Sequence, residues 1–126
     1  MSSSTRIQNQ KFSRVGTFAD LLVRYIRERR DGDAPAVYNA ARIDRRTYSS
    51  IVSNPFRTVS KRTAIQFAVA LRLKRSEADR LLLAAGYALS PAIPEDTVFA
   101  AFISSGEYDF FKINERLDAL GIKVVL

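Results

Sequence analysis

Apolar residues recur along this chain at intervals of three and four, the spacing of one face of an α-helix. In residues 17–29, the stripe Phe18, Leu21, Leu22, Tyr25 and Ile26 follows a Thr17 N-cap. Similar patterns predict helices at about 34–41, 44–53, 61–73, 76–85, 95–105 and 108–120. The apolar tail at 122–126 can pack back on the helices or pair with a second chain as a strand. The pattern predicts an all-α protein.

Polar residues and prolines mark where these helices begin and end. Asp44 and Ser60 are expected N-caps, and Ser76-Glu77-Ala78-Asp79 has the pattern of a capping box. Pro55 prevents the helix at 44–53 from continuing. The connector 87–94 holds two prolines and is the best candidate for a subdomain boundary. We expect no internal repeat.

Three segments follow from these boundaries. Residues 1–15 are expected to be a flexible basic arm, and residues 16–87 a helical domain. Residues 88–126 are expected to be a C-terminal helical extension that packs on this domain. The extension is also a candidate dimerisation element and a candidate surface for a protein partner.

The composition excludes several kinds of site. The 126 residues include no cysteine and no histidine, so disulfides and thiolate metal sites are excluded and the commonest general base is missing. We expect no metal and no cofactor. The carboxylates near Glu95 and Glu107 are expected as helix caps, and no glycine-rich phosphate loop is present, so an enzyme is the least supported class. No apolar run resembles a membrane span or signal peptide, which favours a cytoplasmic protein without a membrane partner.

Charge is unevenly placed along the chain. The net charge is +7 and the pI is about 10.1. Residues 1–80 hold 17 Lys/Arg and 7 Asp/Glu, whereas residues 81–126 hold 3 and 6. Such segregation favours a front part that faces a polyanion. The alternative is an arginine-rich composition with no special partner.

The stretch 34–54 concentrates the candidate chemistry. It reads as two short helices joined by a tight connection, and the second helix carries Arg45, Arg46, Ser49 and Ser50 opposite its apolar side. Arginine pairs bidentately with guanine, and serine hydroxyls bind phosphates. This is the plan of a helix-turn-helix unit.

The run VYNAARIDRRTYSSIVSNPFRTVSKRTAIQFAVALRLKRSEADRLLLAAG resembles the lambda-repressor-like, Cro-type (XRE-like) helix-turn-helix domain. The resemblance covers five helices at about 17–86. It rests on the pattern at Ile43 to Ser49, the loop with Pro55 and the Ser60-capped helix that ends in Ala-Leu-Arg-Leu at 70–73. The last 40 residues, including SPAIPEDTVFAAFISSGEYDFFKINERLDALG, are similar to an extension found on a subgroup of such domains.

The resemblance implies a DNA-binding transcriptional regulator or a DNA-targeting accessory domain, working as a homodimer on double-stranded DNA. The helix at 44–53 would be its recognition helix, lying in the major groove. The implied base contacts are Arg45, Arg46, Ser49 and Ser50. The implied backbone contacts are Arg42, Arg57, Thr58, Lys61 and Arg62, together with the helix start at Pro35 and Ala36.

Two positions depart from the family pattern. Tyr38 stands where the family has a small residue, and Arg42 stands where it has glycine in the turn, which suggests a changed angle between the two helices. A helical protein-protein interaction module is therefore the alternative function. Its working surface would include Phe99, Phe102, Tyr108, Phe110 and Phe111, although the plainer interpretation places most of these aromatics in the core. An RNA-binding protein is a third hypothesis, without a supporting signature.

Overall fold

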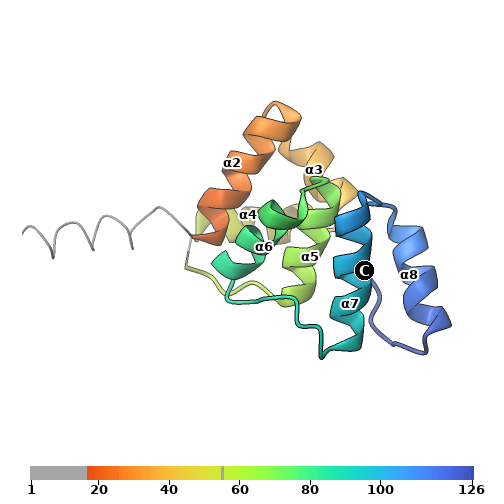
Figure 1. Ribbon diagram of the computed structural model, residues 1–126. Helices are drawn as coiled ribbons and strands as arrows, with labels where there is room; N and C mark the ends of the chain where they lie inside the picture. Colours follow the sequence, from red (N-terminus) through yellow and green to blue (C-terminus); the bar gives the residue numbers. More distant parts are fainter. Residues whose placement is uncertain (1–16, 55) are drawn as a thin grey trace, which may run out of the picture.

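A computed structural model of the chain describes residues 17–54 and 56–126, which form seven α-helices and no strand. The helices are α2 (Phe18–Arg30), α3 (Ala34–Ala40), α4 (Arg45–Ser53), α5 (Lys61–Ala70), α6 (Arg75–Ala84), α7 (Pro94–Ser105) and α8 (Phe110–Ala119) (Figure 1). The predicted all-α class is confirmed. Within the described ranges, no helix is long and apolar enough to cross a membrane. The arm expected at 1–15 lies outside the described residues, as does Pro55.

Three predicted helix starts are confirmed by their caps. Thr17 Oγ1 accepts a hydrogen bond of 3.1 Å from the backbone N–H of Asp20. Asp44 accepts one of 2.7 Å from Thr47, and Ser60 Oγ accepts one of 3.1 Å from Thr63. These side chains satisfy backbone donors that have no partner within the first helical turn.

Three other boundaries differ from the prediction. α5 ends at Ala70 and not near residue 73, because the chain turns there through a left-handed residue. α6 begins at Arg75, so Ser76 is not its cap; the backbone N–H of Lys74 instead donates to Glu77 at 2.9 Å. α8 begins after Asp109, whose carboxylate accepts from the amide of Phe111. In the last two cases a carboxylate sets the start, one or two residues from the expected position.

α5 is the centre of the molecule. Every residue from Ala64 to Ala70 is buried, as expected for a helix that is apolar nearly all round. Phe67 lies in the middle of this run, and its ring approaches Phe18 of α2 at 6.3 Å and Tyr48 of α4 at 6.4 Å between centroids. α5 therefore joins the helices on its several sides into one core.

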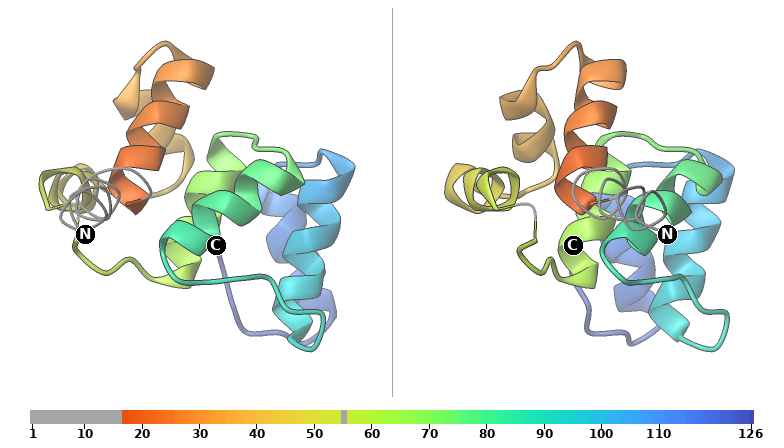
Figure 2. Two further views of the ribbon diagram at one scale, coloured as in Figure 1. Left: turned by 60° about the vertical axis from the view of Figure 1, so that its left-hand side comes forward. Right: turned by 90° about the vertical axis from the view of Figure 1, so that its left-hand side faces the viewer.

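The same core continues across the connector 87–94 into the extension. Val98, Phe99 and Ile103 of α7 and Ile113 and Leu117 of α8 belong to one hydrophobic cluster with α2–α6. α7 and α8 lie side by side, and α5 and α6 separate them from α4 (Figure 2). Residues 88–126 thus share the hydrophobic core of the preceding helices.

The apolar tail packs back on its own chain. Leu126 is buried, and its backbone N–H donates to the Asn114 side chain at 2.8 Å. The Leu126 carbonyl accepts from the Asn114 amide and from Arg42, each at 3.1 Å. Of the two arrangements expected for this tail, the structure shows the one within the chain.

Two connections in the fold repeat each other. The sequence Ala-Ala-Arg-Ile-Asp-Arg at 40–45 links α3 to α4, and Ala-Leu-Arg-Leu-Lys-Arg at 70–75 links α5 to α6. In each, an arginine takes a left-handed conformation, with φ of 63° at Arg42 and 54° at Arg72. The following apolar residue, Ile43 or Leu73, is buried and closes the turn by donating back to the helix. This short internal repeat was not expected from the sequence.

Candidate functional site

The exposed face of α4 begins with two arginines. Arg45 and Arg46 occupy its first turn and are exposed, as is Ser49, while Ser50 is half-buried. On the opposite side Ile51 is buried in the core. The predicted division of this helix into a cationic face and an apolar face is therefore confirmed.

Asp44 adds a fixed negative charge at the start of α4. The hydrogen bonds from the Thr47 amide and hydroxyl, and then the charge of Arg46, hold the pKa of the Asp44 carboxyl below its ordinary value. The carboxylate stays ionised at neutral pH and stabilises the positive end of the helix. The Asp44 cap thereby stabilises the first turn of α4, which carries Arg45 and Arg46.

Tyr38 fills the space between α3 and α4. Its ring lies against that of Tyr48, with centroids 5.1 Å apart and planes tilted by 35°. Burial, and then the neighbouring Tyr38, raise the pKa of the Tyr48 phenol above its ordinary value. The bulky residue is therefore accommodated by an aromatic pair, and the changed helix angle stays a prediction.

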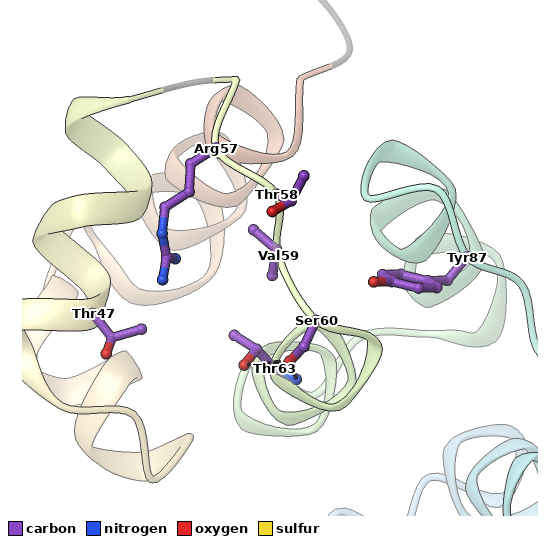
Figure 3. A pocket seen from close by; sticks show the side chains of 7 residues that line it. All are labelled: Thr47, Arg57, Thr58, Val59, Ser60, Thr63 and Tyr87. Carbon is purple, nitrogen blue, oxygen red and sulfur yellow. Dashed lines mark hydrogen bonds between the residues drawn. The ribbon is translucent and has the colours of Figure 1, made fainter.

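A polar pocket of about 360 Å³ lies between α4 and the start of α5 (Figure 3). Arg57 reaches from the connecting loop alongside α4 towards Thr47. The pocket is lined by Thr47, Arg57, Thr58, Val59, Ser60, Thr63 and Tyr87. Hydroxyl groups and one guanidinium dominate this lining, which is the chemistry that binds phosphate oxygens.

Four exposed arginines, of which Arg57 lines this pocket, have no carboxylate oxygen within 4.0 Å in the described part of the chain. Arg45, Arg46, Arg57 and Arg62 are exposed, and the ion pairs of residues 17–54 and 56–126 involve other cations. They come from α4, the loop after it and the first turn of α5. Their charges are therefore available to an external anion.

Two predicted backbone contacts point elsewhere. The Arg42 guanidinium lies 5.0 Å from the centre of the Phe110 ring and donates to the Leu126 carbonyl. Lys61 Nζ lies 2.6 Å from Oδ2 of the buried Asp96. Both cations contact the C-terminal extension, whereas the exposed residues Arg57, Thr58 and Arg62 make no ion pair or cation–π contact with the described part of the chain.

Five of the seven pocket residues were not predicted as site residues: Thr47, Val59, Ser60, Thr63 and Tyr87. Thr63 could have been found, because it stands three residues after the Ser60 cap, and its hydroxyl accepts from Ser60 Oγ at 2.9 Å. Thr47 likewise stands three residues after Asp44. Tyr87 gave no local signal, since only the packing of the segment after α6 brings it to the start of α5.

Comparison with protein-family models, with curated proteins and with solved structures finds no match for the chain. The described residues also contain no group of three or more carboxylates that could hold a metal ion. The case for a function therefore rests on the α4 face and the pocket beside it.

Proposed function

We propose that the protein is a DNA-binding transcriptional regulator or a DNA-targeting accessory domain. In this proposal α2–α6 form a lambda-repressor-like helix-turn-helix domain, and α4 lies in the major groove of double-stranded DNA. Homodimer formation and a cytoplasmic location belong to the same proposal. They follow from the sequence resemblance and composition, and each needs its own measurement.

The proposal rests mainly on the four unpaired arginines. Arg45, Arg46, Arg57 and Arg62 form no ion pair within 4.0 Å among the described residues, although the charge of Arg46 acts on the nearby Asp44 carboxylate. DNA carries one phosphate charge per 1.7 Å of helix axis, which is the kind of partner that such a face attracts.

The residue types suggest a division of labour. Arg45 and Arg46 stand on the first turn of α4, the part of a recognition helix that comes nearest to base edges. Ser49 and Ser50 are small enough to let the helix approach the groove closely. Arg57 and Thr58 would bind a phosphate at the mouth of the hydroxyl-lined pocket, together with Arg62.

Selection from a random duplex pool, followed by salt titration of the selected site, tests this proposal. Arg46→Ala should cost about 1–3 kcal/mol on the selected site and relax the preference at one position. Arg57→Gln should weaken all duplexes alike and reduce the log–log salt slope by about 1. Arg80→Ala is the matched control, because Arg80 is exposed on α6 and does not line the pocket. No duplex affinity at low salt would reject the proposal.

A protein-interaction module remains the alternative, and one observation favours it. Phe111 on α8 is 69% exposed, whereas Phe99 and Phe110 are buried. Phe102 and Tyr108 are partly buried against the same core, so Phe111 is the most accessible of these five aromatics and the one that a partner would contact. If duplex affinity is absent, Phe111→Ser in a partner-capture assay becomes the informative variant.

A further inference from the structure

A second pocket, of about 190 Å³, lies at the other end of α5 from the pocket in Figure 3. Its walls are the ends of α2, α3 and α5 and the α7–α8 connection, through Arg30, Ala40, Val69, Ala70, Arg72, Tyr108 and Phe110. Val69 of the second pocket stands six residues after Thr63 of the first, which is about 9 Å of helix at 1.5 Å per residue, and the two pockets share no lining residue. The second pocket is therefore a separate site.

Positive charge is in excess around this pocket. Arg30 and Arg72 line it, and the Arg42 guanidinium lies over the Phe110 ring that forms one wall. Within residues 17–54 and 56–126, neither Arg30 nor Arg72 has a carboxylate oxygen within 4.0 Å, whereas Arg42 already donates to the Leu126 oxygen at 3.1 Å. The carbonyl ends of the three helices together supply about one and a half negative charges, somewhat less than the two positive charges of Arg30 and Arg72. The lining therefore keeps a net positive charge, which favours an anion.

The two lining arginines keep donors in reserve. A guanidinium has five N–H donors. Arg30 uses one of them on the Ala70 carbonyl, at 3.3 Å. The Arg72 guanidinium lies 5.6 Å from the centre of the Tyr108 ring and makes no hydrogen bond to the described part of the chain. Both groups can donate to an oxyanion without breaking the fold.

The rest of the lining is apolar. The Tyr108 hydroxyl is already occupied, donating to the Leu73 carbonyl at 2.6 Å, so this residue offers the pocket its ring. Phe110, Val69, Ala40 and Ala70 complete the wall. The volume is below the roughly 300–1,000 Å³ of pockets for drug-sized ligands. The space suits a compact apolar body attached to a charged head.

The backbone gives a second reason to assign a role to Arg72. Its φ of 54° lies in the left-handed region, where a residue with a side chain is strained relative to glycine. The corresponding position after α6 is Gly86, with a φ of 91°. The chain thus holds a guanidinium at a position where glycine would end the helix more cheaply.

We propose that this pocket binds a small organic anion, with a carboxylate between Arg30 and Arg72 and an apolar body against Tyr108 and Phe110. The site does not depend on DNA binding. Benzoate is a suitable probe because it has this shape and charge. Benzamide is its neutral counterpart and lacks only the charge.

The experiment is a titration of the full-length protein with benzoate, followed by backbone and arginine side-chain NMR signals at constant ionic strength. Saturable shifts are expected at residues 69–72 and 108–110. Arg72→Gly, which suits the backbone conformation, and Arg30→Gln should each weaken binding at least about tenfold, equivalent to 1.4 kcal/mol. Arg80→Gln, a change of the same kind on α6, should leave it unchanged.

Three results would overturn the proposal: equal binding of benzamide, benzoate affinity unaltered in both pocket variants, or shifts confined to the surroundings of Arg57. If Arg72→Gly changes the fold, Arg30→Gln still tests the proposal. Arg30 is the last residue of α2 and is only half-buried, so its replacement should leave the fold intact. Lack of duplex affinity in the DNA experiments would not bear on this result.

Discussion

Lys61 Nζ lies 2.6 Å from Oδ2 of Asp96, a residue that is only 1% exposed. The same oxygen accepts from the backbone N–H of Ser90 at 2.8 Å. The pair joins the first residue of α5 to the first turn of α7, so it fastens the extension beside the proposed phosphate pocket. Lys61 is therefore a structural cation as well as a member of the basic surface.

Breaking this pair from one side should destabilise the protein. Lys61→Met leaves a buried carboxylate with the Ser90 amide as its remaining described partner, and we expect a loss of about 1–3 kcal/mol in the free energy of unfolding. The double variant Lys61→Met/Asp96→Asn should recover part of this loss, because the amide of asparagine carries no charge. Urea unfolding of the two single variants and the double variant measures the coupling.

The exposed pair of Lys112 and Glu107 is the control for that cycle. Its atoms are 3.3 Å apart and both side chains are well solvated, so Lys112→Met should cost no more than about 1 kcal/mol. Additive losses at Lys61 and Asp96 would show that the buried pair contributes no coupling energy.

Lys61 should contribute less to DNA binding than its position suggests. If the proposed function is right, a phosphate has to compete with Asp96 for this ammonium group, whereas Arg57 has no such competitor in the described chain. We expect Lys61→Gln to change the log–log salt slope by clearly less than the value of about 1 expected for Arg57→Gln. Equal slopes in the two variants would mean that DNA displaces Asp96.

Two substitutions of Arg42 should separate the effect of backbone strain on stability from the effect of its side-chain contacts. Its left-handed conformation favours glycine, while its side chain contacts Phe110 and the Leu126 carbonyl. Both Arg42→Ala and Arg42→Gly lose these contacts, but only glycine relieves the backbone. We expect the glycine variant to be more stable than the alanine variant by about 1 kcal/mol, measured by thermal or urea unfolding. Equal stability would show that the turn relaxes when alanine occupies it.

Hydrophobic spacing and capping residues were enough to predict the helices. Thr17, Asp44 and Ser60 each supply an oxygen three residues before a backbone donor, a relationship that is written in the sequence. The start of α6 was predicted one residue too late. The Glu77 carboxylate accepts from the backbone N–H of Lys74, and the sequence does not show which backbone group a carboxylate will bind. Local rules succeed where the capping atom belongs to a recognisable side chain.

Glu77 should make stability depend on pH. Burial opposes its ionised form, but the hydrogen bonds from the Lys74 amide and the Arg29 guanidinium prevail and hold the pKa below its ordinary value. A lowered pKa in the folded state stabilises the protein above the unfolded-state pKa, and this contribution disappears as the pH falls through the folded-state pKa. Acid titration of the unfolding free energy should therefore be flatter for Glu77→Gln than for the parent protein. Asp79→Gln, which removes an exposed carboxylate from the same helix, is the comparison.

The candidate site was only partly predictable. The α4 face follows from helical periodicity, so Arg45 and Arg46 were placed correctly on the exposed side. The roles of Arg42 and Lys61 depend on Phe110, Leu126 and Asp96, which lie more than 30 residues away in sequence. Charge patterns cannot show that a cation is already occupied by a distant partner. The pocket around Arg30 and Arg72 was missed for the same reason.

The unbroken burial of α5 has a consequence for how the protein opens. All residues between Ala64 and Ala70 are buried, so their backbone amides reach water only when neighbouring segments are displaced. They should exchange their hydrogens only when the whole structure unfolds. The hydrogen-exchange rate of α5 thus reports the global stability of the protein. The difference between the exchange rates of α5 and α4 reports how readily α4 unfolds locally.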